Sequence, residues 1–482
     1  MTLPNVATSA GEAPFRRRRA TLLRHAELAS ALVFADFLAG AAGAWGGPWL
    51  WATFDREFTP TAGLPVWQWA FTLVWFGGLR LFGAGDLLRP RLGRRSLRAV
   101  FLTTVAVTAL VLVGFYAIPF VAPRGSSLLA LPLAALATLV LRFAYLRLVR
   151  SPLLDRRLAI IGTDDAAKRA ALAIIGARDA APYRLVAFVG PPETGDRLFG
   201  RPVISVERDL WADLRRLDVD LVVVGHTRSL PAPFLSELVR CFEQGVEAVP
   251  ATTLYEELTG RVMVAALEAD WYAELPTRVG GVYAVVKRLL DVSVASAAAV
   301  TAPLLFVIAV AILLDSGRPI LVRQIRVGQR GERFVLHKFR TMRPDAEDEG
   351  APVWSTPDDP RRTRVGRVLR RLHLDELPQL WDVLRGRMSL IGPRPERPAF
   401  VERLAAELPL YRARALVRPG ITGWAQVLFP YAGSVEESLA KLEFDLYYVR
   451  HFGPLLDLSI ALRTVATMVG LARPEYEHAE MR

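Results

Sequence analysis

The sequence is nearly devoid of cysteine, since Cys241 is the only one in 482 residues. A single cysteine excludes an internal disulfide, and no Cys-x-x-Cys pair or Cys/His cluster indicates a zinc site. The six histidines are scattered and form no set of metal ligands. Lysine is also scarce, because almost every basic residue is arginine; the four lysines are Lys168, Lys287, Lys338 and Lys441. A lysine retained against this bias is a candidate for a specific role.

The bulk composition favours a membrane protein. Hydrophobic residues make up 52% of the chain, and the formal net charge is +12. Such a charge suits nucleic acid, an anionic membrane surface or phosphorylated substrates. The arginines cluster beside apolar runs and not in a polar domain rich in aromatic residues. Nucleic acid is therefore not expected as a partner, whereas a lipid bilayer and phosphates are.

Four apolar runs follow a polar tail at residues 1–27, and each is near the length that crosses about 30 Å of hydrocarbon. They lie at about 28–45, 66–82, 97–118 and 127–149, so residues 28–150 are predicted to form four transmembrane helices. Asp36, Gln68 and Arg80 interrupt or edge the first two runs. The alternative interpretation is a set of buried helices in a large soluble core.

Arginines between the runs predict the orientation of this bundle. The tail contains Arg16–Arg19 and Arg24, five arginines lie between positions 89 and 98, and four lie between 147 and 157. The other two connections carry only Arg56 and Arg124. Because basic connections stay on the cytoplasmic side, both ends of the bundle are expected to face the cytoplasm.

Residues 151–250 alternate between strand-like and helix-like segments, which predicts a parallel, Rossmann-like sheet. The first strand starts at Arg156 and ends in a tight turn at Gly162, and later strands are expected at 183–189, 203–204 and 221–225. Asp164 and Asp165 stand where a pyrophosphate would approach and would repel it. A structural, dimerising or regulatory role is favoured over dinucleotide binding, and residues 251–286 are interpreted as a connector.

A further apolar run at residues 287–315 has basic residues at both ends, which is the cytoplasmic pattern on each side. Pro303 lies near its middle and breaks or kinks a helix there. A break at the centre and two cytoplasmic ends predict a re-entrant hairpin that enters and leaves the same membrane face. The alternative is a straight fifth span, which would carry the rest of the chain to the other side.

The chemistry is expected to centre on Asp375 and Glu376, two adjacent carboxylates in residues 316–482. Pro378 suits the first turn of a helix, which places both carboxylates at or before a helix N-terminus. Taken alone, the pair could be an N-cap and a solvated acidic side chain. Arginines frame it, however, at positions 364, 367, 370, 371 and 394. This arrangement indicates a phosphate-handling site.

Other segments of the same region supply candidate phosphate ligands and secondary structure. Lys338 and Arg340 are expected on one face of a strand, two residues apart, and Arg418 lies beside a glycine-rich loop. An amphipathic helix is predicted at 398–416. Residues 441–452 and 455–470 are predicted to form amphipathic helices on the membrane surface.

From residue 287 to about 470 the chain resembles the bacterial sugar transferase family, the monotopic phosphoglycosyl transferases. The resemblance rests on QIRVGQRGERFVLHKFRTM, DPRRTRVGRVLRRLHLDELPQL, MSLIGPRPERP, RPGITGWAQV and DLYY, in this order. The four predicted spans and the Rossmann-like domain resemble the large subgroup, the undecaprenyl-phosphate hexose-1-phosphate transferases. That part of the resemblance depends on layout more than on motifs.

The resemblance implies transfer of a hexose 1-phosphate from a UDP-sugar to undecaprenyl phosphate, with release of UMP and with Mg²⁺ as cofactor. Asp375 matches the nucleophile, which forms an aspartyl phosphosugar intermediate, and Glu376 completes the dyad; both are expected near the metal. Lys338, Arg340, Arg364, Arg394 and Arg418 are the candidates for binding phosphates. Such enzymes act in the bacterial inner membrane with the catalytic domain facing the cytoplasm, and they start exopolysaccharide, capsule or O-antigen assembly.

Two other functions are compatible with parts of the sequence. A non-catalytic membrane scaffold or sensor would not need Asp375, and a membrane phosphatase would use the same nucleophile with water as acceptor. The hexose is not specified by the sequence, although UDP-glucose and UDP-galactose are favoured by family habit. A homodimer is compatible with the sequence but not required by it.

Overall fold

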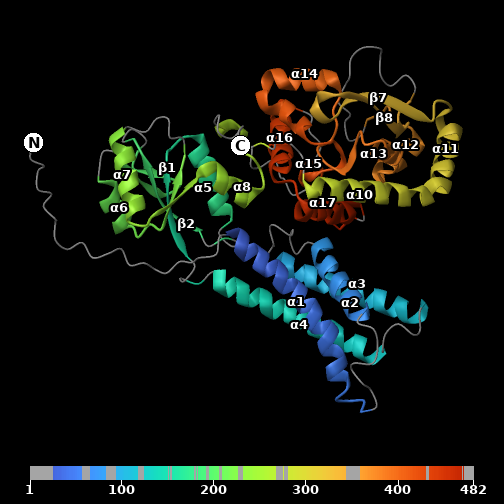
Figure 1. The fold of residues 1–482 in the computed structure, drawn as a ribbon, viewed down its shortest axis with the longest axis horizontal. Coiled ribbons are helices and arrows are strands. Elements are labelled where there is room, and N and C mark those ends of the chain that lie inside the picture. The colour runs from blue at the N-terminus through green and yellow to red at the C-terminus, as the bar shows by residue number, and fades with distance from the viewer. Residues whose placement is uncertain are drawn as a thin grey trace, which may run out of the picture. The chain divides into compact units, whose positions relative to one another are not determined.

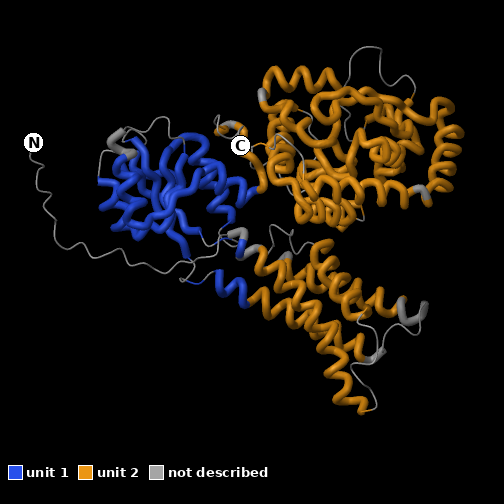
Figure 2. The backbone as a smooth tube through the Cα atoms, viewed as in Figure 1, with its two compact units in different colours: residues 1–28, 144–259 blue, residues 29–143, 260–482 orange. Residues whose placement is uncertain are grey.

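The structure is a computed structural model of the whole chain. It describes residues 25–56, 66–82, 94–117, 124–149, 151, 155–177, 181, 183–191, 195–205, 209–225, 232–267, 275, 281–343, 359–429, 434–468 and 470–471. The predicted tail and several arginines of the connections, including Arg89 and Arg91, lie outside these residues. The chain divides into two compact units, residues 1–28 with 144–259 and residues 29–143 with 260–482 (Figure 2).

The first unit contains the predicted α/β sheet (Figure 1). Its elements are β1 (Arg156–Ile161), α5 (Asp165–Gly176), β2 (Tyr183–Gly190), β3 (Arg197–Leu198), β4 (Arg201–Ser205), α6 (Leu210–Arg216), β5 (Leu221–Val224), α7 (Ala232–Glu243), β6 (Glu247–Pro250) and α8 (Ala251–Thr259). The strand order is β3-β4-β2-β1-β5-β6, and every pair is parallel except β3 with β4. The alternation in the sequence therefore predicted the sheet correctly.

The sheet is buried on both faces, which explains the unbroken apolar run of its central strand. Leu158 and Ile160 face one core with α5 and α8, whereas Ala159 and Ile161 face the other with α6 and α7. The turn after β1 has Gly162 at φ +110°, a backbone conformation that suits glycine. α5 then begins where the Asp164 carboxylate accepts a hydrogen bond from the Ala167 amide at 2.9 Å.

Four long helices lie near the start of the chain, and most of their residues belong to the second unit. They are α1 (His25–Trp51), α2 (Val66–Leu81), α3 (Arg94–Ala117) and α4 (Arg124–Val149). Two stretches, Ser96–Val113 and Ser126–Val149, are long and apolar enough to cross a membrane by length and composition. Asp36 and Arg80, which interrupt the predicted spans, are buried together: Asp36 binds both Arg80 and Arg142. This pairing lets apolar helices carry buried charges.

The remainder of the second unit is the α/β region that carries the motifs quoted above, from QIRVGQRGERFVLHKFRTM to DLYY. Its elements are α10 (Val282–Ala297), α11 (Ala302–Ser316), β7 (Leu321–Val327), β8 (Arg333–Phe339), α12 (Arg364–Arg371), α13 (Gln379–Leu384), β9 (Ser389–Ile391), α14 (Pro398–Glu407), β10 (Gly420–Thr422), α15 (Trp424–Leu428), α16 (Val435–His451) and α17 (Pro454–Met468). β7 and β8 form an antiparallel hairpin, and β9 pairs in parallel with β10.

The predicted break in the apolar run coincides with a bend between helices. A short 3₁₀ turn, Ala298–Thr301, separates α10 from α11, and the two helices are bent by 64°. Pro303 lies in the first turn of α11, where its missing N–H costs no helical hydrogen bond. The Thr301 hydroxyl donates to the Ala298 carbonyl at 2.6 Å. The helical pair therefore spans 282–316, slightly longer than the predicted 287–315.

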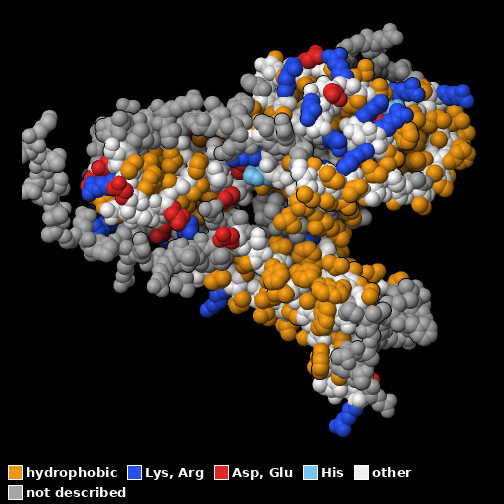
Figure 3. Space-filling model, in the orientation of Figure 1, with side chains coloured by type: hydrophobic (Ala, Val, Ile, Leu, Met, Phe, Trp, Pro, Cys, Tyr) orange, Lys and Arg blue, Asp and Glu red, His pale blue; other side chains and the backbone are white. Residues whose placement is uncertain are grey.

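Many apolar side chains of α10, α11 and the 3₁₀ turn between them are exposed. They include Val282, Val285, Leu289, Val294, Val300, Phe306, Val307 and Leu314. In Figure 3, hydrophobic side chains cover the edge of the α/β region at α11 and much of the helices α1–α4, whereas lysine and arginine gather elsewhere on the α/β region. Each of these exposed apolar areas is typical of a membrane contact.

Two helix predictions near the end of the chain were wrong in detail. The predicted helix 398–416 is α14 followed by a separate 3₁₀ helix, Pro409–Leu416, because Pro409 ends the first segment. The predicted surface helix at 441–452 belongs to α16, which is buried on most sides and packs Phe444, Leu446 and Tyr448 into the core. Its polar residues misled the prediction because they form buried ion pairs.

Candidate active site

The two carboxylates lie in a 3₁₀ turn, Leu374–Glu376, that precedes α13. Pro378 is the residue before the first turn of α13, close to its predicted place. The turn is reached from α12, whose Thr363 hydroxyl accepts the Gly366 amide at 2.9 Å. A Cβ at Gly366 would lie 2.1 Å from the Thr341 carbonyl oxygen, so only glycine lets α12 pack this closely beyond the end of β8. The local sequence thus fixes the turn beside the hairpin.

Asp375 is buried, with 8% of its surface exposed. Among the described residues its carboxylate has no hydrogen bond and no ion pair within 4 Å. Burial, together with the neighbouring charge of Glu376, raises the pKa of Asp375, and the positive charges of Lys338, Arg370 and Arg394 oppose this shift. A buried carboxylate that no side chain occupies, facing several cations, is available to a reacting group.

The Glu376 carboxylate, unlike that of Asp375, is bound in an ion pair with an arginine. Arg394 Nη2 donates to its Oε1 at 2.6 Å. Burial would raise the pKa of Glu376, but the charge and hydrogen bond of Arg394 outweigh it and hold the pKa below its ordinary value. The same contact raises the pKa of the Arg394 guanidinium. Because 42% of the Arg394 side chain is still exposed, it can also contact a ligand.

Lys338 lies on β8 and directs its charge toward the same carboxylates. Burial, helped by the nearby charges of Arg326, Arg370 and Arg394, lowers its pKa from 10.5 to about 8, and the charge of Asp375 opposes the shift. The described part of the chain offers Lys338 no hydrogen bond or ion pair. A partly buried ammonium group without a partner is suited to receive an anion.

The other predicted phosphate ligands are placed differently. Arg340 is buried and donates to the carbonyls of Ser316, Gly317 and Arg318 at 2.6–2.7 Å, so its guanidinium closes the C-terminus of α11. Arg364 is exposed on the first turn of α12. Within the described residues, neither Arg364 nor Arg418 bonds to the carboxylates.

Arg370 is a site residue that the sequence analysis did not select. Its charge acts on both Asp375 and Lys338, and its Nε donates to the Thr341 hydroxyl at 2.8 Å. Its position on the helix could have indicated that it lies on the inward face of α12. Position 370 is four residues after the buried Gly366 and follows the buried Leu369, whereas Arg364, Arg367 and Arg371 are exposed.

The segment that carries Arg394 is held at four consecutive carbonyls. Those of residues 393, 394, 395 and 396 accept, in order, from Gly420 N at 2.9 Å, Arg414 Nη2 at 3.0 Å, Arg326 Nη1 at 3.0 Å and Val327 N at 2.9 Å. The donors come from three separate elements: β7, the 3₁₀ helix Pro409–Leu416 and β10. Arg394 is therefore placed by a rigid backbone and not by a mobile loop.

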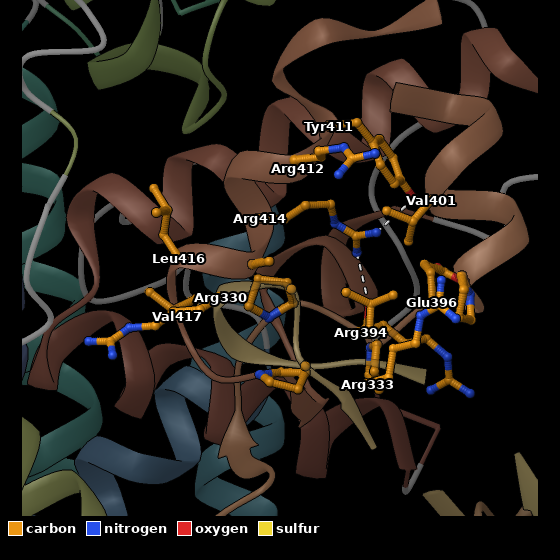
Figure 4. A pocket seen from close by; sticks show the side chains of 18 of the residues that line it. Arg330, Arg333, Arg394, Glu396, Val401, Tyr411, Arg412, Arg414, Leu416 and Val417 are labelled. Carbon is orange, nitrogen blue, oxygen red and sulfur yellow. Dashed lines mark hydrogen bonds between the residues drawn. The ribbon is translucent and has the colours of Figure 1, made fainter. Parts of the chain in front are cut away.

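A buried polar network supports this segment from behind. Arg414 binds the Asp445 carboxylate at 2.7 Å. Arg414 also donates to the Tyr411 hydroxyl at 2.7 Å (Figure 4). Lys441 binds Glu396 at 2.7 Å. Asp445 and Lys441 are the polar residues of α16 that were predicted to lie at a membrane surface. They serve instead to position the Arg394 segment.

The structure offers carboxylates for a divalent cation, but no complete protein cage. Within the described residues, no group of three or more His, Cys, Asp or Glu side chains is arranged to hold a metal ion. Mg²⁺ is commonly held by one or two carboxylates together with substrate phosphates and water. The unoccupied carboxylate of Asp375 and the second oxygen of Glu376 fit that arrangement.

A buried acidic dyad surrounded by cations, beside an apolar helical pair, defines a membrane-associated phosphate-handling site. Residues 282–470 match the model of the family described as bacterial sugar transferase. The chain is 44% identical over 187 residues to the UDP-glucose:undecaprenyl-phosphate glucose-1-phosphate transferase of Caulobacter vibrioides, which covers 38% of this chain and 69% of that protein. This chain belongs to the bacterial sugar transferase family.

Other relatives differ in the sugar they are named for and in length. The UDP-N-acetylgalactosamine-undecaprenyl-phosphate N-acetylgalactosaminephosphotransferase of Aeromonas hydrophila is 40% identical over 233 residues, 48% of this chain and 54% of that protein. The exopolysaccharide production protein PSS of Rhizobium leguminosarum is 40% identical over 189 residues, 38% of this chain and 94% of that protein. The chain thus spans about half the length of the Aeromonas relative.

Proposed function

We propose that this chain transfers a sugar 1-phosphate from a UDP-sugar to undecaprenyl phosphate and so starts the assembly of an extracellular polysaccharide or O-antigen. One observation carries the proposal: Asp375 is buried and unoccupied among cations, while Glu376 beside it is bound to Arg394. The names of the relatives support both substrates. They name glucose and N-acetylgalactosamine, so the sugar remains open.

In the first step, a carboxylate oxygen of Asp375 attacks the phosphorus next to the sugar. The bond from that phosphorus to the bridging oxygen breaks, and its electron pair leaves with UMP. The product is an aspartyl phosphosugar on the enzyme. Lys338, Arg370 and Arg394 neutralise charge on the phosphate. Asp375 and Glu376 would hold Mg²⁺, which would supply further charge neutralisation.

In the second step, a phosphate oxygen of undecaprenyl phosphate attacks the same phosphorus. The bond from phosphorus to Asp375 breaks, its electron pair returns to the carboxylate, and the lipid carries the sugar on a diphosphate. Glu376 keeps Arg394 oriented through both steps. Because the acceptor is a lipid, the site must lie at membrane depth.

The bent helical pair meets that requirement if it is a re-entrant hairpin. Its two ends are anchored on the same catalytic unit. At the α10 end, Lys287 binds Asp457 at 2.6 Å, and Arg288 donates to the carbonyls of Val383 and Leu384. At the α11 end, Arg340 binds residues 316–318, and Asp315 accepts the Val365 amide at 3.0 Å. A folded unit that holds both ends favours the hairpin over a straight span.

We therefore infer the inner membrane as the location, with four spans in residues 28–150 and the catalytic unit in the cytoplasm. The basic connections of the sequence support this orientation. UDP-sugars are made in the cytoplasm, so the donor meets the site there.

The test is UMP release by the purified full chain with Mg²⁺ and a panel of UDP-sugars, with and without undecaprenyl phosphate. A sugar diphosphate lipid should form only with the acceptor present. Asp375→Asn should abolish transfer while the protein remains folded in the membrane. UMP release with water as the only acceptor would favour a hydrolase. Full activity of Asp375→Asn would show that Asp375 is not the nucleophile.

A further inference from the structure

A cavity of about 340 Å³ lies beside the Arg394 segment, and the start of β8, the strand that carries Lys338 further along, forms part of its lining. Its walls come from the β7–β8 turn, the Pro393–Glu396 segment, α14 and the 3₁₀ helix Pro409–Leu416 (Figure 4). Arg394 belongs to both places, since it lines the cavity and binds Glu376. A ligand in the cavity would therefore reach the carboxylate dyad through Arg394.

The cavity combines cationic groups with an apolar wall. Arg330, Arg394 and Arg412 provide guanidinium groups, and the apolar wall is formed by Pro393, Pro395, Pro398, Val401, Leu416 and Val417. The acidic lining residues are already bound: Glu396 to Lys441, and Glu402 to Arg333. The uncompensated charge of the cavity is therefore positive.

Arg330 has a conformation that suggests a role beyond the turn. It lies at φ 58° and ψ 19°, in the left-handed region that residues other than glycine seldom adopt, although Gly331 follows it directly. Such backbone strain persists where the surrounding structure or a function maintains it. Arg330 is exposed at the cavity, and the described residues give its side chain no hydrogen bond or ion pair.

We propose that this cavity binds the uridine monophosphate half of the donor. The inference rests on the proposed function and adds the place and the residues. The volume falls in the range of small-ligand sites and suits a nucleoside monophosphate, whereas a long isoprenoid chain would not fit. The apolar wall receives the base, and Arg330 and Arg394 bind the phosphate that departs with UMP.

The experiment measures binding of UMP alone to the purified full chain in lipid nanodiscs, followed by steady-state kinetics. Arg330→Ala should weaken UMP binding and raise KM for the UDP-sugar about five- to twentyfold, and leave KM for undecaprenyl phosphate unchanged. Arg330→Gly should lose UMP affinity equally while relieving the backbone strain. Arg403→Ala is the matched control, because Arg403 is an exposed arginine of α14 outside the cavity.

A second probe separates this inference from the proposed function. Asp375→Asn should bind UMP as the wild type does although it cannot transfer sugar. Ala415→Phe, which fills the cavity, should lose UMP binding. Unchanged UMP binding in Arg330→Ala, or a raised KM for undecaprenyl phosphate alone, would overturn the cavity assignment while transfer still stands. Loss of transfer to any lipid acceptor, with UMP binding intact, would overturn the function but not the cavity.

Discussion

At the scale of single residues, the site depends on two groups whose ionisation is shifted in opposite senses. Burial lowers the pKa of Lys338 to about 8, so its cation is present below that pH and is lost as the pH rises through it. We expect kcat/KM to fall above about pH 8, because this parameter reports the free enzyme. A pH profile of transfer checks this.

Substitutions at Lys338 test whether this residue causes the fall of kcat/KM at alkaline pH, the alkaline limb of the profile. Lys338→Ala should reduce kcat/KM about ten- to a hundredfold, the value of a hydrogen bond of roughly 1.5–3 kcal/mol to a charged group. Lys338→Arg keeps the charge at all accessible pH values and should move the alkaline limb upward. An unchanged limb in Lys338→Arg would assign it to another group.

The dyad supplies a second residue prediction. Glu376→Gln removes the charge that orients Arg394, so we expect a large loss of kcat and a shifted Mg²⁺ dependence, measured by titration of the metal. The acid limb should remain, because it belongs to Asp375, whose raised pKa means that the nucleophile is lost by protonation as the pH falls. If Glu376→Gln lacks the acid limb, the group that titrates there is Glu376 and not Asp375.

At this scale, the sequence allows prediction of residues that stand in local motifs, but not of contacts between residues far apart in the chain. Asp375, Glu376 and Lys338 were recognisable because each stands in a local motif. The bond from Arg394 to Glu376 crosses 18 residues and needed the fold. Arg340 follows Lys338 by two positions, which suggested that both side chains share a face. However, β8 ends at Phe339, and the Arg340 side chain turns to the end of α11.

At the scale of elements, the Arg394 segment should depend on the network behind it. Removing one partner of a buried ion pair typically costs 3–5 kcal/mol, so Asp445→Ala should destabilise the unit by about that amount and lower kcat. Unfolding in denaturant and steady-state kinetics check this. Tyr411→Phe is the matched control, because it removes one hydrogen bond but leaves the Arg414–Asp445 pair intact. Equal effects of the two variants would contradict the positioning role.

Elements with a clear apolar pattern were predicted correctly, whereas the helix that belongs to this network was not. The Rossmann-like sheet followed from alternating apolar segments, and α10 and α11 from a long apolar run with Pro303 inside it. Helix α16 was misassigned because Asp445 and Lys441 read as a polar face. Only their partners, Arg414 and Glu396 on distant segments, show that this face is buried.

The bend itself is open to test at this scale. Pro303→Ala should favour a continuous helix through the present bend, misplace the catalytic unit and lower activity, although residue 303 contacts no phosphate. The measurement is transfer in membranes at equal protein level. Ala299→Gly, also in the bend, is the control and should retain activity.

At the scale of the whole molecule, the arrangement in the membrane decides whether donor and acceptor can meet. Residues on both sides of the apolar pair should be cytoplasmic, because both ends are anchored on one catalytic unit. We replace Cys241, which is buried, by alanine and introduce single cysteines as Arg278→Cys or Arg323→Cys. A membrane-impermeant maleimide should label both from the cytoplasmic side. Arg56→Cys, between the first two helices, should label only from the other side. Opposite labelling of positions 278 and 323 would establish a straight span and would place Asp375 away from the UDP-sugar.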